Sequence, residues 1–386
     1  MKRIVAVIRR ELGIWRRRPI YLVGSVVVMA FCSIFYLTLL KDGVPSELPI
    51  GVVDYDNSTL TRNFISQLDA TQLGKVVRYD DFRQAREDMQ KGQITSVCVL
   101  PEGMFADVQA QRQPEFTFYV NNLYFLGGSL AYKDILTMIN LTSGAVQREV
   151  LRMKGINEHS IMGRIRPVDV DVHLIGNPTM NYGAYLANMM LPGVLEMVII
   201  IIVIYSLGTE LKYGTSRHLL DTSGGSITTA VAGKLALYTL LFTALGFSLV
   251  FLLYRWMGFR LAGSIWNMLI GMLLLVLSSE AVGVLIIGCV PVLRFALSIG
   301  ALFSVFAFSM TGFTLPVEAM PAGVQGLACM FPLRHYYLFY VQEGIFGTGF
   351  AGWHMQTVYM LMFLLLPPLV LPRLKRAYVN LNFPKK

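Results

Sequence analysis

Long apolar runs alternate with polar segments along most of the chain. Five runs carry at most one formal charge each: Ile20–Leu40, Leu186–Leu207, Val231–Leu253, Ile265–Val290 and Phe295–Phe313. A sixth run, Trp353–Leu371, is shorter and is interrupted by Pro367 and Pro368. About 18 apolar residues in a helix cross a ~30 Å hydrocarbon core, and within lipid a helix satisfies its own backbone hydrogen bonds. The pattern therefore predicts an α-helical polytopic membrane protein with six transmembrane helices.

Residues 41–184 follow a different pattern, in which short apolar runs alternate with helix-like stretches. The strand-like runs are Ile50–Asp54, Lys75–Tyr79, Ile94–Leu100, Phe116–Val120 and Val168–Ile175, and the longest helix-like stretch is Leu130–Met153. Strands and helices that alternate at this length are typical of an α/β layer domain with a partly parallel sheet. We therefore expect an inserted α/β domain at 41–184, between the first transmembrane helix (20–40) and a five-helix bundle (185–371).

Lys and Arg gather at alternate ends of the predicted spans. They precede the first span (Lys2, Arg3, Arg9, Arg10, Arg16, Arg17, Arg18), flank the link between the second and third (Lys212, Arg217, Lys234), and follow the fourth and sixth (Arg294, Arg373, Lys375, Arg376). The positive-inside rule makes this side cytoplasmic. We therefore expect a multi-pass protein of the cytoplasmic (inner) membrane with both termini inside, a cytoplasmic tail at 372–386, and an extracytoplasmic domain at 41–184.

Composition supports the membrane interpretation and excludes a nucleic-acid partner. Charged residues make up 15% of the chain and hydrophobic residues 54%, whereas about a quarter of a soluble globular chain is charged. The formal net charge is +9, but residues 41–180 hold 14 basic and 17 acidic residues, a net charge of −3. The positive charge is therefore juxtamembrane, where anionic headgroups of the lipid bilayer account for it.

Residues 1–19 predict a cytoplasmic amphipathic interface helix. Ile4, Ile8, Leu12 and Trp15 share one face, and the basic residues occupy the opposite arc. Such a helix is suited to lie in the headgroup plane. Glu11 projects onto the apolar face, where lipid disfavours a charge. Either its side chain reaches back to the headgroups, or it meets a protein partner.

Two carboxylates stand inside predicted spans, Glu196 in the second and Glu280 in the fourth. Ionisable residues at such depth usually face a bundle interior, a partner or water. One interpretation is a polar contact in a transport pathway or at a dimer seam. The structural alternative is a protonated carboxyl hydrogen-bonded to neighbouring hydroxyls such as Ser278 or Ser279.

The sequence lacks the common catalytic, metal-binding and nucleotide-binding motifs. It contains no G-x-S-x-G, no H-E-x-x-H, no metal-ligand spacing and no G-x-x-x-x-G-K-[ST] phosphate-binding loop. Asp56, Asn57 and Ser58 follow a strand-like run and are expected to form a turn and a helix cap. We therefore expect no catalytic, metal or cofactor-binding site in this chain.

The order of these elements resembles the permease subunits of ABC-2 type exporters, in particular the subfamily with a large extracytoplasmic domain after the first span. Four segments carry the resemblance: Ile50–Ser58 (IGVVDYDNS), Asn177-Pro178 with Leu191-Pro192-Gly193, Glu210–Thr215 (ELKYGT) with Leu219 and Leu220, and Gly312-Phe313 with Pro316, Glu318, Met320, Pro321 and Pro332. Two positions depart from the family pattern, where Lys212 replaces a frequent acidic residue and Ser223 a frequent proline.

The resemblance implies a membrane subunit that exports hydrophobic or amphiphilic cargo. ATP and magnesium would bind to a separate cytoplasmic ABC ATPase, and a second permease subunit, identical or related, would complete the pathway. A periplasmic adaptor protein is a further partner that the resemblance allows.

Two segments receive candidate roles on this basis. The link at 208–228 would couple to the ATPase, with an ordinary loop as the alternative, and the segment at 314–350 would form outer re-entrant helices, with a single surface-lying helix as the alternative. The ATPase-coupling candidates are Glu11, Glu210, Gly214, Thr215, Leu219 and Leu220, and the pathway or gate candidates are Glu196, Glu280, Pro316, Glu318 and Pro321.

Two other classes of membrane protein compete with this interpretation. A secondary transporter predicts inverted repeats, but the first three and last three spans show no convincing repeat. A receptor with an extracytoplasmic sensing domain needs a cytoplasmic output module, and only fifteen residues follow Leu371.

Overall fold

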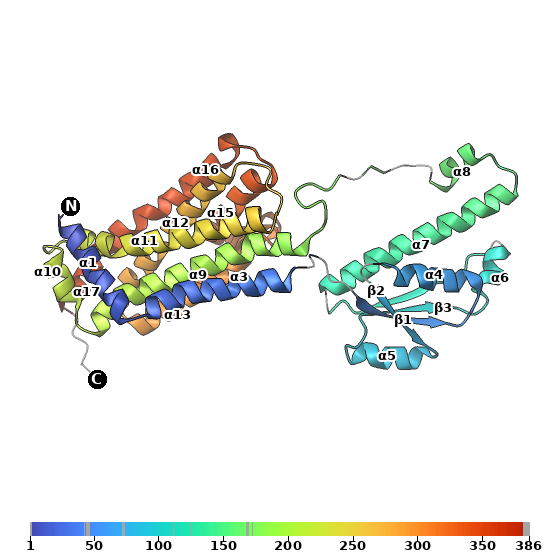
Figure 1. Ribbon diagram of the computed structural model, residues 1–386, viewed down its shortest axis with the longest axis horizontal. Helices are drawn as coiled ribbons and strands as arrows, with labels where there is room; N and C mark the ends of the chain where they lie inside the picture. The colour runs from blue at the N-terminus through green and yellow to red at the C-terminus, as the bar shows by residue number, and fades with distance from the viewer. Residues whose placement is uncertain are drawn as a thin grey trace. The chain divides into compact units, whose positions relative to one another are not determined.

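The structure is a computed structural model that describes residues 2–41, 43, 47–71, 74–110, 112–123, 125–166, 170–171 and 173–380. It divides into two compact units (Figure 1). The helical unit comprises Met1–Lys41 and Leu174–Lys386, and the sheet unit comprises Asp42–His173. Residues 174–184, which we expected in the inserted domain, belong to the helical unit.

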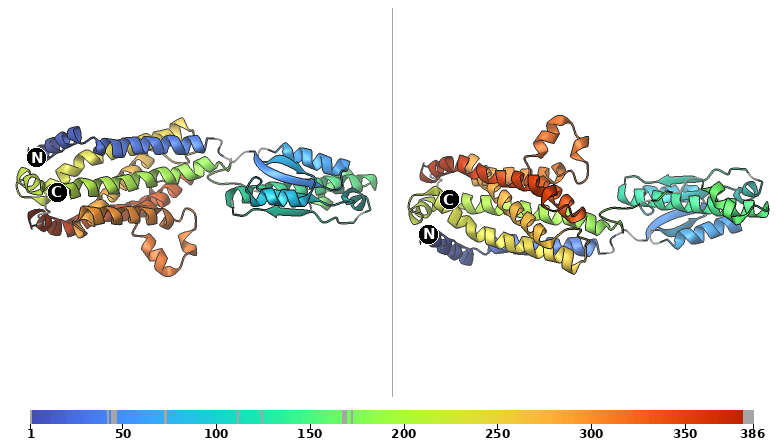
Figure 2. Two further views of the ribbon diagram at one scale, coloured as in Figure 1. Left: turned by 90° about the horizontal axis from the view of Figure 1, so that it is seen from below. Right: turned by 90° about the horizontal axis from the view of Figure 1, so that it is seen from above.

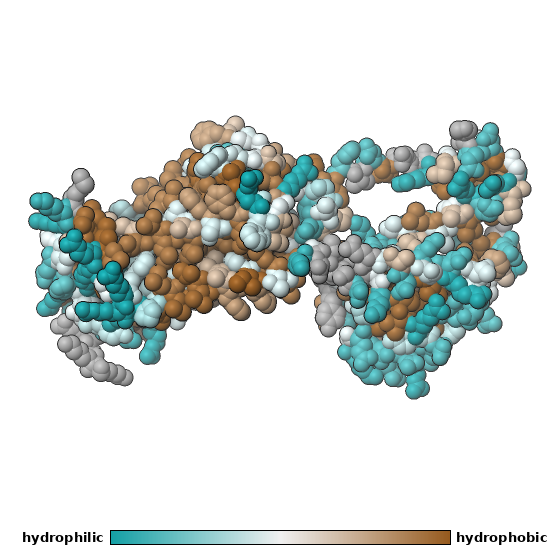
Figure 3. Space-filling view, viewed as in Figure 1, coloured by the Kyte–Doolittle hydropathy of each residue, from teal (hydrophilic) through white to brown (hydrophobic). Residues whose placement is uncertain are grey.

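Six helices of the helical unit, among the described residues, are long and apolar enough to cross a membrane. They are Ile20–Leu39, Tyr182–Lys212, Ile227–Trp256, Ile265–Cys289, Leu293–Met310 and Phe350–Asn380. Each coincides with one of the six apolar runs in the sequence. On the face shown in Figure 3, hydrophobic side chains cover the middle of this unit, and polar side chains gather at the end formed by the first helix. The prediction of a mostly helical, multi-pass membrane protein is confirmed.

The elements of this unit follow in chain order: α1 (Lys2–Arg17), α2 (Ile20–Leu22), η1 (Val23–Val27), α3 (Val28–Leu39), α9 (Tyr182–Lys212), α10 (Ser216–Thr222), α11 (Ile227–Phe251), η2 (Leu252–Trp256), α12 (Ile265–Cys289), α13 (Leu293–Met310), η3 (Val317–Ala319), α14 (Ala322–Ala328), α15 (Pro332–Tyr340), η4 (Val341–Ile345), α16 (Phe350–Met362), η5 (Phe363–Leu365) and α17 (Leu366–Asn380). In Figure 1, α1, α10 and the end of α17 lie at the same end of the unit.

Helices α9 and α12 form the centre of the bundle. In each, more than 70% of the apolar window is buried, compared with 22–28% in the other four spans. Glycines allow the close approach of their neighbours. A Cβ atom at Gly193 would lie 2.3 Å from the Phe308 ring of α13, and one at Gly283 would lie 2.9 Å from Val203. Small residues at helix contacts are typical of packing inside membranes.

The sixth span is longer than the sequence predicted. The chain is helical from Phe350 to Asn380, so the expected span Trp353–Leu371 and part of the expected tail form one structure. Pro367 and Pro368 do not end it: they lie in the first turn of α17, directly after the 3-10 turn η5 that joins α17 to α16. Residues 381–386 of the expected tail lie outside the described residues.

The segment at 314–350 is divided into four short helical pieces, η3, α14, α15 and η4. The alternative of one surface-lying helix is therefore wrong. Pro316 and Pro321 directly precede η3 and α14, and Pro332 begins α15. In Figure 2 the orange segment that contains η3 and α14 projects from the side of the bundle.

The sheet unit contains a small sheet with helices on both faces. Its elements are β1 (Leu48–Asp54), α4 (Thr59–Asp69), β2 (Gly74–Tyr79), α5 (Phe82–Gln90), β3 (Ser96–Leu100), α6 (Met104–Gln109), β4 (Thr117–Val120), α7 (Phe125–Met153) and α8 (Glu158–Ile165). The strand order is β2-β1-β3-β4, with β1 parallel to β2 and β3, and β4 antiparallel to β3. These four strands lie where the sequence predicts them.

The alternation of side chains along β1 builds two cores. Ile50 and Val52 pack against Phe64 of α4 and Ile135 of α7, and Val53 packs on the opposite face with Ala85 of α5. Ser58 caps α4 by accepting a hydrogen bond of 3.2 Å from the N–H of Thr61, as the sequence predicted. The expected strand 168–175 is not observed at 170, 171 and 173–175, and its other residues lie outside the described residues.

Candidate functional site

Four charged side chains from three helices meet at one end of the helical unit. Lys234 of α11 places its Nζ 2.6 Å from Oε2 of Glu11 in α1 and 2.8 Å from Oε1 of Glu210 in α9. Arg10 donates two hydrogen bonds of 2.8 Å to Glu210, one to each carboxylate oxygen. Two cations thus balance two carboxylates. We call Arg10, Glu11, Glu210 and Lys234 the charge cluster.

The charge cluster is almost completely removed from solvent. The side chains of Glu11, Glu210 and Lys234 are between 0% and 3% exposed, and the Tyr238 hydroxyl donates a 2.7 Å hydrogen bond to Glu11 Oε1. Burial disfavours the charge on Arg10, but the hydrogen bonds and negative charge of Glu210 outweigh it and raise the pKa of Arg10. Removing one partner of such a buried pair typically costs about 3–5 kcal/mol. The charge cluster therefore holds α1 onto α9 and α11.

The apolar face of α1 packs against protein at its centre. Val7 is buried where Gly233 lets the two helices approach, and the Trp15 ring meets the Tyr238 ring edge-on at 5.0 Å. Of the two alternatives for Glu11, the reach back to the headgroups is not observed; its side chain instead contacts Lys234 of the same chain, and a separate protein partner is untested. Glu11 is therefore buried within this chain, and its expected role in ATPase coupling stays a prediction.

The link after α9 is a packed helix rather than an ordinary loop. The Thr215 hydroxyl donates to Glu210 Oε2 at 2.5 Å, and the Ser216 hydroxyl donates to the backbone carbonyl of Tyr378 in α17 at 2.9 Å. Leu219 and Leu220 of α10 are buried. Side chains of the same segment remain exposed at Lys212, Tyr213, Thr215, Arg217 and His218.

The expected coupling residues of the link thus fall into two groups. Glu210, Leu219 and Leu220 are buried and fix the link to the bundle. Gly214 and Thr215 are exposed. Gly214 has a φ of +67°, which favours glycine, and a Cβ there would meet no atom within 4 Å. Glycine is therefore favoured at position 214 by the positive φ of the turn and not by a lack of space for a side chain.

The two intramembrane carboxylates are buried in different surroundings. Glu196 is 0% exposed; among the described residues no side chain hydrogen-bonds its carboxylate, and the backbone N–H of Leu333 in α15 lies against it. Glu280 places Oε2 2.7 Å from the Thr239 hydroxyl of α11. Ser278 and Ser279, the partners we expected, donate instead to backbone carbonyls of their own helix. Glu196 and Glu280 are thus both buried and are not paired with each other.

The other gate candidates lie on the segment that projects from the bundle. Pro316, Glu318 and Pro321 are all exposed. Glu318 Oε1 lies 3.7 Å from Nη2 of Arg334, a mostly buried side chain whose Nη1 donates to the carbonyl of Thr311 at 3.3 Å. These contacts connect the projecting segment to α13 and α15.

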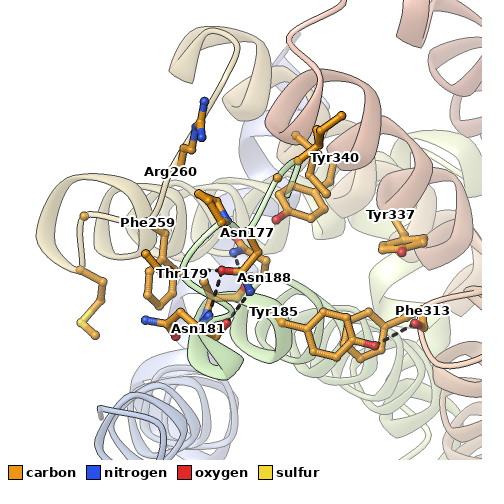
Figure 4. Close-up of a pocket in the computed structure, with 17 residues that line it drawn as sticks. Asn177, Thr179, Asn181, Tyr185, Asn188, Phe259, Arg260, Phe313, Tyr337 and Tyr340 are labelled. Carbon is orange, nitrogen blue, oxygen red and sulfur yellow. Dashed lines mark hydrogen bonds between the residues drawn. The ribbon is translucent and has the colours of Figure 1, made fainter. Parts of the chain in front are cut away.

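A pocket of about 470 Å³ opens at the beginning of α9 (Figure 4). Five aromatic side chains, three amides and one cation are among the residues that line it: Phe259, Tyr185, Phe313, Tyr337, Tyr340, Asn177, Asn181, Asn188 and Arg260. We call it the aromatic pocket. The Tyr185 ring stacks on Phe313 at 4.2 Å and its hydroxyl donates to the Phe313 carbonyl at 3.0 Å.

The lining of the aromatic pocket suits an amphiphilic molecule. Aromatic faces accept apolar groups, and a few polar side chains orient a ligand. Arg260 is exposed and makes no ion pair among the described residues, so its charge is available to a ligand. The sequence did not predict the pocket, because the residues that line it come from four separate segments of the chain. It indicated only that the tyrosines near 336–340 suit an interface.

Sequence reasoning also missed buried polar residues that organise the helical unit. Lys234 was read as a juxtamembrane charge, although a lone lysine early in an apolar run signals a buried partner. Glu343 accepts hydrogen bonds from Ser264 N, Asn267 Nδ2 and Trp353 Nε1 at 2.7–2.9 Å. Among the described residues, no group of His, Cys, Asp and Glu is arranged to hold a metal ion.

The chain was compared with known proteins. The family model described as ABC-2 family transporter protein matches residues 19–370. The match includes most of the helical unit and the whole sheet unit. Comparison with curated proteins returns no match.

Proposed function

The chain belongs to the ABC-2 family of transporter proteins, and from this premise we propose that it is the permease subunit of an ATP-driven exporter. The permease component of this family does not hydrolyse ATP by itself. We propose that a separate cytoplasmic ABC ATPase binds ATP and magnesium and drives transport through this chain. The absence of a phosphate-binding loop motif from the sequence supports this division of labour.

The observation that carries the proposal is the attachment of the exposed link to several spans at once. Glu210 joins the link to α1 and α11 through the charge cluster, and Ser216 joins α10 to α17. A force applied to the exposed surface at Tyr213–Thr215 would therefore move these helices together as a rigid body. We infer that this surface contacts the ATPase.

The aromatic pocket supports hydrophobic or amphiphilic cargo. It lies at the opposite end of α9 from Glu210, roughly 30 Å away at 1.5 Å per helical residue. Glu196 lies on the same helix between Asn188 and Glu210 and is buried without a side-chain partner among the described residues. We propose that α9 lines the pathway, that Glu196 and Glu280 contribute polar contacts to it, and that the pocket receives cargo on its way out.

A second permease subunit, a copy of this chain or a related one, would complete the pathway. Two spans expose large apolar side chains along their length: Phe31, Ile34 and Phe35 in α3, and Phe295, Leu302 and Val305 in α13. Lipid or a second subunit can cover such faces. We propose that the end with α1 and α10 is cytoplasmic, in an inner membrane, and that the sheet unit is extracytoplasmic, where it could meet a periplasmic adaptor.

Site-specific crosslinking tests the ATPase contact. A photoreactive phenylalanine analogue at Tyr213, which is 44% exposed, should crosslink in membranes to a polypeptide that carries a phosphate-binding loop. The matched control is Tyr119 of the sheet unit, which is 42% exposed and should give no such product. Crosslinks from Tyr119 but not from Tyr213 would contradict the proposal.

A further inference from the structure

A second pocket, of about 460 Å³, lies between α1 and the link and is strongly basic. Its lining includes Arg9, Arg10, Arg17, Arg18 and His218, and a single carboxylate, Glu210. Four guanidinium groups therefore face one negative charge, and that charge is already bound by Arg10 and Lys234. We call this the arginine pocket. Its excess charge favours an anionic ligand.

The arginines are spaced to converge on one site. Residues four apart on a helix are neighbours on its surface, so Arg9 and Arg17 each lie one turn from Gly13, and both line the pocket. The Arg18 guanidinium lies 4.2 Å above the Tyr213 ring, which fixes its position. Arg9 and Arg17 are exposed and have no partner among the described residues. Their hydrogen-bond donors are free for a ligand.

Gly13 lies at the wall of the pocket and adds no side chain to it. Glycine in a helix interior lowers helix stability relative to alanine, so a packing reason is normally found for it. At Gly13 none exists, because a Cβ would meet no atom within 4 Å. The missing side chain leaves space between the two arginine pairs, at the wall of the pocket.

We propose that the arginine pocket binds the phosphate group of an anionic phospholipid. The planar guanidinium group matches the geometry of phosphate oxygens with two parallel donors. The pocket also includes Tyr21, in the first turn of the first span, beside the exposed apolar side chains of Ile20, Leu22 and Val23. A headgroup in the pocket thus leaves its acyl chains alongside apolar surface. This inference goes beyond the proposed transport activity; the pocket shares Thr215 with the surface proposed to contact the ATPase, so it is tested on the chain without an ATPase.

Lipid titration of the purified full-length chain, followed by native mass spectrometry, tests the proposal. The probes are phosphatidylglycerol, phosphatidylcholine and inorganic phosphate. The double variant Arg9→Gln/Arg17→Gln should bind phosphatidylglycerol about 100-fold more weakly, since each hydrogen bond to a charged group contributes about tenfold or more. The matched control, Lys2→Gln/Arg16→Gln, removes the same charge from α1 outside the pocket and should bind as the wild type does.

A steric variant tests the site without changing charge. Gly13→Phe should fill the pocket and weaken phosphatidylglycerol binding at least as strongly as the loss of two arginines, whereas Gly13→Ala should have little effect. Equal losses in the Arg9/Arg17 and Lys2/Arg16 variants would show diffuse surface attraction and overturn the site. If inorganic phosphate binds as tightly as phosphatidylglycerol, the pocket recognises free phosphate, and the proposal of a phospholipid ligand is wrong. Thermal unfolding of each variant shows whether a loss of binding reflects a loss of fold.

Discussion

Lys234 and Glu11 are 223 residues apart in the sequence, yet Nζ of the lysine lies 2.6 Å from Oε2 of the glutamate. Each explains the position of the other. Glu11 occupies the apolar face of an amphipathic helix, and Lys234 occupies an apolar run, and lipid disfavours both charges when they are alone. Together with Glu210 and Arg10 they attach α1 to the bundle at the end where the link is exposed.

Lys234 is expected to be the member of the charge cluster whose loss destabilises the fold most. Lys234→Met should lower the free energy of unfolding by about 3–5 kcal/mol, because Glu11 and Glu210 both lose a buried partner. Glu11→Gln should cost less, because Lys234 keeps Glu210. Thermal unfolding of the purified protein measures both effects.

The control for this series is Lys375→Met, which removes an exposed lysine of α17. A surface substitution of this kind should change stability by no more than ~0.5 kcal/mol. A Lys234→Met variant as stable as the Lys375→Met variant would contradict the buried contacts on which the coupling argument rests.

The turn at Gly214 provides a test of the link. A β-branched residue does not readily adopt the positive φ of this position, and L-residues in that region cost roughly 1–2 kcal/mol. Gly214→Val should therefore displace the exposed turn, so that the ATPase still hydrolyses ATP while transport falls. Gly214→Asn is the matched control, because asparagine tolerates positive φ. Uncoupling of equal size by both substitutions would assign the effect to any added side chain rather than to the turn.

Substitution of Glu196 is expected to lower transport without lowering the stability of the fold. Its buried carboxylate has no side-chain hydrogen-bond partner among the described residues, only the backbone N–H of Leu333, and a buried charge costs more stability than a buried neutral amide. Glu196→Gln is expected to unfold at the same or a higher temperature than the wild type while transport falls. The neighbouring lipid-side substitution Met197→Leu should change neither quantity. Full transport by Glu196→Gln would remove Glu196 from the pathway.

Topology can be tested with single cysteines in a cysteine-free background. Cysteines at Gln90 and Gln113 of the sheet unit should react with an impermeant maleimide added from outside, once the outer barrier is permeabilised. Cysteines at Arg217 and Asp221 should react only after the inner membrane is opened. All four positions are exposed in the structure. Tyr378 is unsuitable as a probe because it is 1% exposed, and the reverse labelling pattern would invert the proposed orientation.

Hydropathy and periodicity located the spans and the four strands because these elements depend on local patterns of side chains. The six apolar runs can be recognised by their length and their lack of charge. Strand β1 can be recognised by the alternation of side chains around Ile50 and Val52. The end of the sixth span was missed because the apolar run stops at Leu371, whereas helix α17 continues through the basic residues Arg373, Lys375 and Arg376 to Asn380.

The candidate sites were harder to predict because they depend on which segments meet. Glu11 was recognised as an anomaly on its own helix, but its partner lies in the third span, and no local pattern connects the two. The same holds for Glu280, whose hydroxyl partner Thr239 belongs to another helix and not to the adjacent serines. The aromatic pocket combines side chains from both halves of the helical unit, from Asn177 to Tyr340.

The most direct test of the permease assignment is ATP-dependent transport by purified components in proteoliposomes. The chain alone should neither hydrolyse ATP nor move an amphiphilic dye. The chain reconstituted with its ATPase, oriented with the ATPase outside, should hydrolyse ATP and accumulate the dye inside the vesicle. Dye accumulation driven by an ion gradient in vesicles that contain this chain and no ATPase would contradict the assignment and indicate a secondary transporter.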